Sequence, residues 1–324
     1  MIARVLIAAL MLGTTSMCAG ARGAAAREAV VRGVFAVIDP QPTGEDLVDV
    51  RRDGVNLVIL QYTVGADEEF TSDRQAKLRQ FIRNADSADL PYMIGLYWND
   101  TWEEAWLDPR TLTSREWRAK TIDLFASKNV ALTARLRPLL TKGFRGWYMP
   151  LEVGNAGSAA HYDYLASSFG AFKSLPEPVA MSVYFNPNTQ EYLPHDAFAH
   201  EVAKFAACFN VLILQDSVGA RRISDFAAEL HPYYASISKV AEKGSTKFWA
   251  DVEGFECPHV DADRQCDVTL VPADPGRVRR QVIAAREHTA NVVGYDLVQF
   301  LAPRGGGPKA LAYRAFVGET TRHR

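Results

Sequence analysis

Eight short apolar runs, separated by segments whose apolar residues recur at helical spacing, constrain the fold of this chain most strongly. They occupy residues 33–40, 55–64, 91–98, 146–153, 179–187, 211–219, 247–256 and 293–301. Leu78, Phe81 and Ile82 illustrate the helical spacing between runs, and a last helical pattern covers residues 309–317. Thr43, three residues before Asp46, and Ser72 are predicted to cap the starts of two helices. Eight strand-then-helix units in order predict an α/β protein, a (β/α)8 TIM barrel.

Composition agrees with one folded domain of this kind. The chain has 324 residues, of which 48% are hydrophobic and 23% charged, and we assign the barrel to residues 30–320. An open, doubly wound sheet is the alternative fold, but residues 39–42 read Asp-Pro-Gln-Pro where that fold usually carries a glycine-rich phosphate loop. The net charge of −2 offers no basic surface for nucleic acid.

The first 26 residues have the order of a secretory signal peptide. Arg4 precedes the apolar run 5–12, and small residues at 19–21 and 24–26 suit a signal peptidase. The apolar run is too short to span a bilayer, and no later segment is long and apolar enough to do so. We therefore expect an exported protein, periplasmic or secreted, without a membrane span. We also expect it to be a monomer.

Export makes the cysteines informative. Cys257 and Cys266 flank a polar loop and could form a disulfide in an oxidising compartment, whereas Cys208 lies in an apolar segment. No cysteines or histidines show a metal-ligand spacing; His195 and His200, for example, are five positions apart. We expect neither a metal nor another cofactor.

Polar side chains end every predicted strand, and active sites of β/α barrels lie at these carboxyl ends. The residues at these ends are Asp39, Gln61, Asn99, Glu152, Asn186, Gln215, Asp216, Glu253 and Gln299. Single polar residues at strand ends also serve structural roles, so this pattern alone only suggests a site.

Side-chain alternation selects two of these residues. In the fourth run, Trp147, Met149 and Leu151 share an apolar face, which leaves Glu152 on the other face. In the seventh run, Trp249, Asp251 and Glu253 lie opposite Phe248, Ala250 and Val252. The apolar faces suit packing against outer helices. Glu152 and Glu253 are therefore predicted to point into the barrel mouth.

Two inward carboxyl groups are what glycoside hydrolysis requires. One protonates the departing oxygen, and the other attacks the anomeric carbon or activates water. Six aromatic residues near the strand ends are candidates for stacking on sugar rings: Tyr62, Tyr97, Trp98, Tyr184, Trp249 and Phe300. The amide side chains at the strand ends can bond sugar hydroxyls, and Asp216 and Asp251 can orient the glutamates. Each of these residues could equally belong to the core or hold a loop.

The chain resembles the glycoside-hydrolase-like barrels grouped as domain of unknown function family 4434. The resemblance rests on residues 33–35, 56–63, 146–152, 214–219 and 248–256. The layout is also similar to the large clan of retaining β/α-barrel glycosidases. That similarity implies that Glu152 is the acid/base and Glu253 the nucleophile. The clan usually has Asn before the first glutamate, where this chain has Leu151.

Two functions follow from these patterns. The first is a glycoside hydrolase that cleaves an oligo- or polysaccharide with the Glu152–Glu253 pair, and the second is a non-catalytic, glycan-binding barrel in envelope or exopolysaccharide handling. Glu256 is an alternative to Glu253 because it lies three residues further on. A metal-dependent phosphodiesterase is disfavoured because ligand clusters are missing from the sequence.

Overall fold

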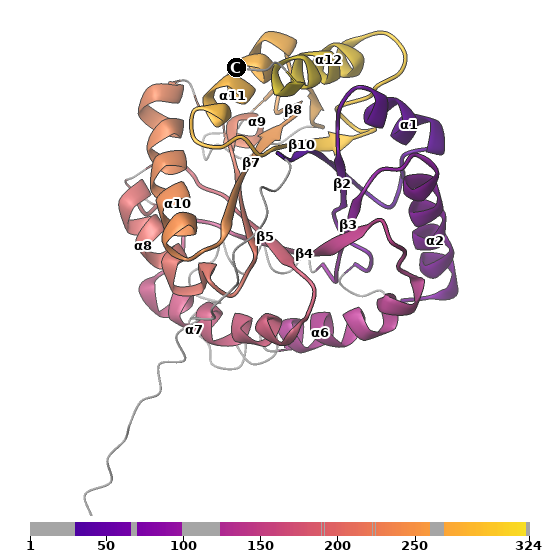
Figure 1. Cartoon of the computed structure of the whole chain (residues 1–324). Coiled ribbons are helices and arrows are strands. Elements are labelled where there is room, and N and C mark those ends of the chain that lie inside the picture. Colours follow the sequence, from indigo (N-terminus) through magenta and orange to yellow (C-terminus); the bar gives the residue numbers. More distant parts are fainter. Residues whose placement is uncertain are drawn as a thin grey trace, which may run out of the picture.

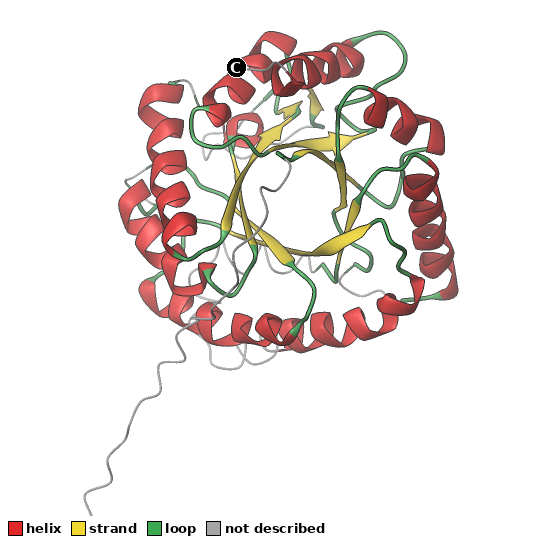
Figure 2. Ribbon diagram, viewed as in Figure 1, coloured by secondary structure: helices red, strands yellow, loops and turns green. Residues whose placement is uncertain are grey.

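Eight parallel strands close into a barrel surrounded by helices (Figures 1 and 2). The computed structural model describes residues 30–65, 70–98, 124–188, 190, 192–221, 223, 225–259 and 269–321. The barrel strands are β1 (Arg32–Ala36), β2 (Leu57–Leu60), β3 (Tyr92–Gly95), β4 (Phe144–Val153), β5 (Val179–Val183), β6 (Val211–Gln215), β7 (Lys247–Glu253) and β10 (Val292–Leu297). Each lies within or largely overlaps one predicted run. Pairing of β1 with β10 closes the sheet and excludes the open alternative.

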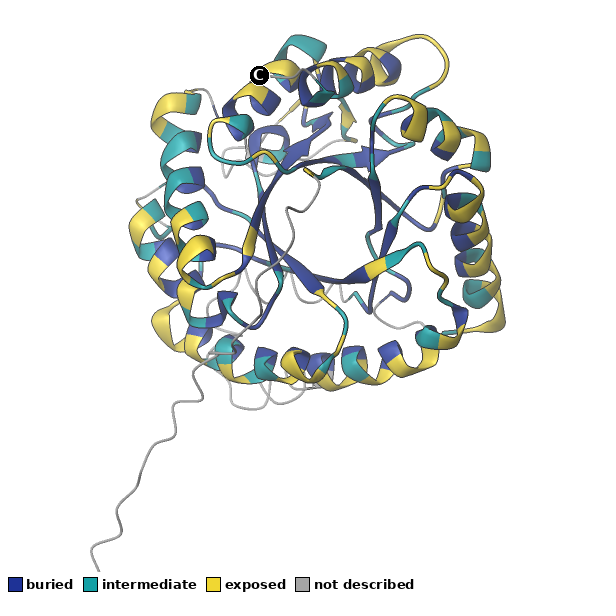
Figure 3. Ribbon diagram, viewed as in Figure 1, coloured by how far each residue is buried: buried dark blue, intermediate teal, exposed yellow. Residues whose placement is uncertain are grey.

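The outer ring consists of helices that follow the strands. They are α1 (Gly44–Arg52), α2 (Ser72–Ser87), α6 (Leu124–Leu136), α7 (Ala159–Phe169), α8 (His195–Ala206), the short α9 (Val218–Arg221), α10 (His231–Lys243), α11 (Pro275–Arg286) and α12 (Pro308–Thr321). Shorter helical turns are η2 (Arg137–Leu139), η3 (Gly170–Ser174) and η4 (Phe226–Leu230). Each long helix has a buried face toward the barrel and an exposed face outside, as Figure 3 shows. The predicted last helix is confirmed.

Two apolar clusters make up the core, one on each face of the sheet. Trp147, Met149, Leu151 and Val153 of β4 belong to the outer cluster, which packs under the helices. The inner cluster fills the barrel and contains Phe35, Leu57, Ile59, Met93, Tyr148, Ala180, Val211, Ile213, Trp249 and Val293. Successive residues of a strand thus alternate between the two clusters, which confirms the predicted alternation.

Helix starts follow local capping chemistry. Thr43 accepts a hydrogen bond from the amide of Asp46, and the Asp46 side chain returns one to Thr43, as its spacing predicts. At α2 the cap is Thr71, which accepts a bond from the amide of Arg74; Ser72 was predicted to cap this helix but is its first residue. The difference is one residue, and a hydroxyl caps the helix in both cases.

The seventh run is not a single strand. It leaves the barrel at Gly254, and β8 (Phe255–Glu256) pairs antiparallel with β9 (Val271–Pro272) in a separate two-stranded sheet. Gly254 donates to the carbonyl of Tyr295 at 2.6 Å, and a Cβ there would lie 2.6 Å from the same oxygen. A larger residue would therefore separate β7 from β10 at this point.

Some predictions fall outside the described residues. They concern the signal peptide at 1–26, the connection at 99–123, Asn99, and Cys266 of the predicted disulfide. Cys208 is buried in the outer cluster, as its apolar surroundings predict. Among the residues that the structure describes, no helix has the length and apolar character needed to cross a bilayer.

Gly95 provides a test of how closely β2 and β3 approach at the carboxyl end of the barrel. A Cβ at this position would overlap the backbone carbonyl of Gln61, which cannot move without disturbing β2. We expect Gly95→Ala to lower the free energy of unfolding by roughly 1–3 kcal/mol or more, measured by urea denaturation. Gly170→Ala is the matched control because nothing lies within 4 Å of its Cβ position. Equal stability of both variants would contradict this description of the strand contact.

Candidate active site

A cavity of about 400 Å³ opens at the carboxyl ends of the barrel strands. It is lined by Val37, Gln61, Tyr62, Trp98, Glu152, Tyr184, Gln215, Ser217, Ala220, Asp251, Glu253, Phe255, Leu270, Tyr295 and Gln299. This volume lies within the range of roughly 300–1,000 Å³ that is typical of small-molecule sites. The lining brings together nine of the residues proposed from sequence: Gln61, Tyr62, Trp98, Glu152, Tyr184, Gln215, Asp251, Glu253 and Gln299.

Glu152 reaches the cavity from an irregular end of β4. Met149 is paired with Met181, but the next partner of β5, Ser182, is opposite Glu152, so β4 bulges between these positions. Pro150 has no amide hydrogen to give to a neighbouring strand, and a bulge tolerates this loss. Glu152 is part-buried, and the Gln215 side chain donates a hydrogen bond of 2.6 Å to its Oε1.

Glu253, at the end of β7, is 5% exposed and held by backbone amides. Its Oε2 accepts hydrogen bonds from Gly219 at 2.7 Å and from Ala220 at 3.0 Å. A Cβ on Gly219 would lie 3.0 Å from this oxygen, so glycine permits the close approach. Burial, followed by the nearby Asp216 carboxyl, raises the pKa of Glu253 to about 8 even though the two amides act in the opposite direction.

Asp216 lies behind Glu253 and does not line the cavity. It is fully buried and accepts hydrogen bonds from the Gln281 side chain at 2.6 Å and the Val218 amide at 3.1 Å. Burial raises its pKa to about 6, while the bond from Gln281 opposes the shift. Gln281 also donates to the backbone carbonyl of Glu253 at 3.3 Å. Helix α11 thus helps to hold both Asp216 and the end of β7.

Asp251 is a third carboxyl group in the cavity wall, two residues before Glu253 on the same face of β7. It is 2% exposed, and its Oδ1 has no hydrogen-bond partner among the described residues. Burial, with further contributions from Asp216, Glu253 and Glu152, raises its pKa well above the ordinary value. Burial therefore favours the neutral form of Asp251, and this form can donate a hydrogen bond.

Aromatic and amide side chains form the remaining polar and flat surfaces of the cavity. The rings of Tyr62 and Trp98 stack with centroids 5.4 Å apart and planes 29° apart. Gln61 accepts a hydrogen bond of 3.1 Å from the Tyr295 hydroxyl. Gln299 follows β10, the other neighbour of β1, and its side chain donates a hydrogen bond of 3.0 Å to the Asp296 carboxyl. A rigid aromatic surface next to fixed amides is suited to a ligand with both apolar faces and hydroxyl groups.

Several residues proposed from sequence do not line the cavity. Asp39 is exposed and bonds Lys77 at 2.9 Å, and Tyr97 packs on Phe125 in the outer cluster. Asn186 is buried in a loop, where its side chain accepts a bond from the Asn188 amide. Of the two tryptophans proposed to stack on sugar rings, Trp98 lines the cavity and Trp249 does not. Trp249 fills the barrel interior with the inner cluster.

Tyr295 is a lining residue that the sequence analysis missed. It lies two positions after Val293, an inner-cluster residue of β10, so strict alternation would have placed it on the inner face. Phe255 and Leu270 were also missed, and they come from β8 and from just before β9. No periodic signal marks those two residues because they belong to segments outside the barrel.

The raised pKa of Glu253 leads to a prediction about stability and pH. A glutamate titrates near 4.3 in an unfolded chain, so between pH 4 and about 8 the folded protein binds more protons at this site. The free energy of unfolding should therefore fall as pH rises, by up to about 1.4 kcal/mol for each pH unit. Removing the carboxyl with Glu253→Gln should reduce this loss between about pH 6.5 and 8.5, above the range of Asp216.

The measurement is a series of urea denaturation curves across this pH window. Glu242→Gln is the control because Glu242 is exposed near the end of α10, and its curves should run parallel to those of the wild type. If Glu253→Gln and the wild type lost stability equally as pH rose, Glu253 would titrate as an ordinary surface carboxylate.

The barrel is similar in fold to several solved structures of glycoside hydrolases. One is a protein assigned as an alpha-L-fucosidase from Bacteroides thetaiotaomicron VPI-5482, with a TM-score of 0.64, 15% identity, and 89% of this chain and 95% of that chain covered. A chitinase from Chromobacterium violaceum ATCC 12472 has a TM-score of 0.55 and 11% identity, with 91% of this chain and 100% of that chain covered. A beta-galactosidase from the psychrophilic Marinomonas ef1 has a TM-score of 0.54 and 12% identity, with 89% of this chain and 58% of that chain covered.

At these identities the comparisons establish the fold alone. No curated protein matches the sequence. Residues 44–306, most of the chain, match the family described as Domain of unknown function (DUF4434). The resemblance noted in the sequence is therefore confirmed: the chain belongs to the DUF4434 family and has a glycosidase-like TIM-barrel fold.

Proposed function

We propose that this protein hydrolyses glycosidic bonds of an oligo- or polysaccharide, with Glu152 and Glu253 as the catalytic pair and no cofactor. The observation that carries the proposal is that both carboxyl groups line one cavity at the carboxyl ends of β4 and β7. Folds that are similar to this barrel belong to enzymes described as a chitinase and a beta-galactosidase, which supports a carbohydrate substrate.

The proposed reaction proceeds in two steps with retention at the anomeric carbon. Glu253 attacks that carbon while Glu152 gives its proton to the departing oxygen, so a glycosyl ester forms on Glu253. Glu152, now a carboxylate, removes a proton from water. The water oxygen then attacks the anomeric carbon, the ester bond breaks, and both glutamates return to their starting states.

The surroundings of the two glutamates support these roles. Glu152 is part-buried, so it can exchange a proton with water between the two steps. Glu253 is almost fully buried, and two backbone amides fix one of its oxygens. A fixed carboxylate can be aimed at one carbon atom, and the amides stabilise it when it leaves as an anion in the second step.

The cavity walls support a sugar as the ligand. The stacked rings of Tyr62 and Trp98 offer an apolar surface for one face of a pyranose ring, and Gln61, Gln215 and Gln299 can bond hydroxyl groups. In its neutral form, which burial favours, Asp251 can donate a hydrogen bond next to Glu253. Such a donor is useful near an oxygen that gains negative charge in the reaction.

Removing either carboxyl should stop the reaction without unfolding the protein. We expect Glu152→Gln and Glu253→Gln each to lower the rate of polysaccharide cleavage by about 10²–10⁴-fold or more. The measurement is reducing-sugar release from bacterial and plant polysaccharides by the purified protein, with circular dichroism to check folding. Glu256→Gln is the control because Glu256 is half-exposed, lies in β8 and does not line the cavity.

Three results would reject parts of this proposal. Undiminished cleavage by both glutamine variants would exclude the pair as catalytic groups. Tight glycan binding by the wild type, without cleavage of any bound glycan, would favour the non-catalytic, glycan-binding barrel. Loss of activity in Glu256→Gln alone would move the second catalytic role from Glu253 to Glu256.

The roles of the two glutamates can be separated by pH. Because a nucleophile must be ionised, the rise in the pKa of Glu253 to about 8 predicts that kcat/KM increases with pH up to about 8. If Glu253 were instead the proton donor, kcat/KM would decrease above about pH 8. Proton NMR of the first product formed would identify retention or inversion directly.

We also propose that the protein acts outside the cytoplasm, on the grounds of the signal-like residues 1–26. An exported protein would meet envelope or extracellular polysaccharides. Cell fractionation with a C-terminal tag, compared with a variant that lacks residues 2–26, tests this localisation. A wild-type protein that remained in the cytoplasm would contradict it.

A further inference from the structure

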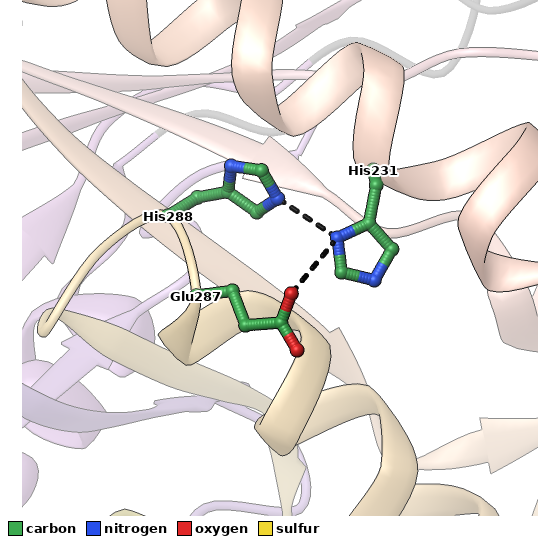
Figure 4. Close-up of side chains that lie close together, drawn as sticks. All are labelled: His231, Glu287 and His288. Carbon is green, nitrogen blue, oxygen red and sulfur yellow. Dashed lines mark hydrogen bonds and ion pairs between the residues drawn. The ribbon is translucent and has the colours of Figure 1, made fainter.

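Two histidines and a glutamate meet on the outer layer of helices, away from the cavity. His231 begins α10, while Glu287 and His288 directly follow the last residue of α11 (Figure 4). None of the three lines the cavity of the candidate active site. His231 and His288 are separated by 57 positions in the sequence, so no ligand spacing could have indicated the cluster.

The three side chains turn their donor atoms toward one another. His231 Nδ1 lies 2.9 Å from His288 Nε2 and 3.5 Å from Glu287 Oε2, and all three atoms lie within 4.8 Å of each other. Donors around a tetrahedral zinc ion are about 3.3 Å apart, since its bonds to nitrogen and oxygen are about 2.0–2.2 Å long. Small rotations of the side chains would therefore bring all three atoms to ligand distance.

The surrounding structure holds the histidines in place before any ion binds. Pro232 follows His231 in the first turn of α10, and the amide of His288 donates to the carbonyl of Ala285 at 3.0 Å. The fully buried ring of Tyr234 packs against the His288 ring with centroids 5.5 Å apart. Each histidine thus sits on a fixed backbone, and only Glu287 is exposed. Such preorganisation lowers the entropy lost on binding.

We propose that His231, Glu287 and His288 bind one divalent transition-metal ion of the zinc class, with water completing the coordination. Imidazole nitrogen suits Zn²⁺, Cu²⁺ and Ni²⁺, whereas Mg²⁺ and Ca²⁺ prefer sites made of oxygen atoms alone. The ion would link the start of α10 to the end of α11. Its role is structural because the site is separate from the cavity, so the proposal does not depend on the proposed hydrolysis.

The test is isothermal titration of the full, chelator-treated protein with Zn²⁺ or Ni²⁺. We expect one saturable site, absent with Mg²⁺, and a higher Tm when Zn²⁺ is present. His231→Gln and His288→Gln should weaken binding by more than the roughly 10–100-fold that the loss of an outer-shell partner costs. The exposed Glu287→Gln should also weaken it, and this change leaves the packing of the helices intact.

His200→Gln is the matched control, since His200 lies on α8 and belongs to no such cluster among the described residues. Its affinity for Zn²⁺ should equal that of the wild type. Nitrogen couplings in the spectrum of bound Cu²⁺, measured by electron paramagnetic resonance, should indicate two imidazoles. Unchanged Zn²⁺ affinity in His231→Gln, His288→Gln and Glu287→Gln, or the absence of saturable binding by the wild type, would overturn the proposal.

Discussion

Pairing between the first and last strands of the barrel is the constraint on which the rest of the structure depends. Arg32 pairs with Val292 and Gly33 with Val293, and this contact closes a sheet that would otherwise have two open edges. Closure separates an interior filled by the inner cluster from an exterior covered by helices. It also sets β4 and β7 around a common mouth, so that Glu152 and Glu253 line the same cavity.

Three buried carboxyl groups lie at or just behind the mouth of the barrel, an arrangement that stability alone would not favour. Asp216, Asp251 and Glu253 are each at most 5% exposed, and burial raises the pKa of all three. Removing carboxyl groups from water is costly unless they are neutral or well bonded. The protein uses both means: Gln281 and backbone amides bond Asp216 and Glu253, while the raised pKa of Asp251 favours its neutral form. Such a concentration of perturbed acids is typical of functional sites.

The outer layer of helices carries a second group of polar side chains. The His231–Glu287–His288 cluster is half-exposed and rests on the ends of helices that pack on the barrel. Its rings pack on each other, and His288 also packs on the buried Tyr234 ring. None of the three cluster residues lines the cavity, although α11 contacts both regions, through Gln281 within the helix and through the cluster after its last residue.

Local patterns determined much of this structure. Alternation of apolar residues predicted the eight strands and the inward direction of Glu152 and Glu253, because every barrel strand has one face toward the interior and one toward the helices. The capping box at Thr43 could also be predicted from the sequence, because its two residues are only three positions apart.

What tertiary structure alone decided depends on contacts between distant segments. Alternation predicts which face of the sheet a side chain takes but not its position along the barrel axis. Trp249 lies in the interior, whereas Asp251 and Glu253, further along the same face of β7, reach the cavity. The pKa of Glu253 depends on Asp216 and on amides from α9, and the histidine cluster depends on where the start of α10 meets the end of α11. A sequence sets the direction of each side chain along its own element, but distances between elements arise only when the barrel closes.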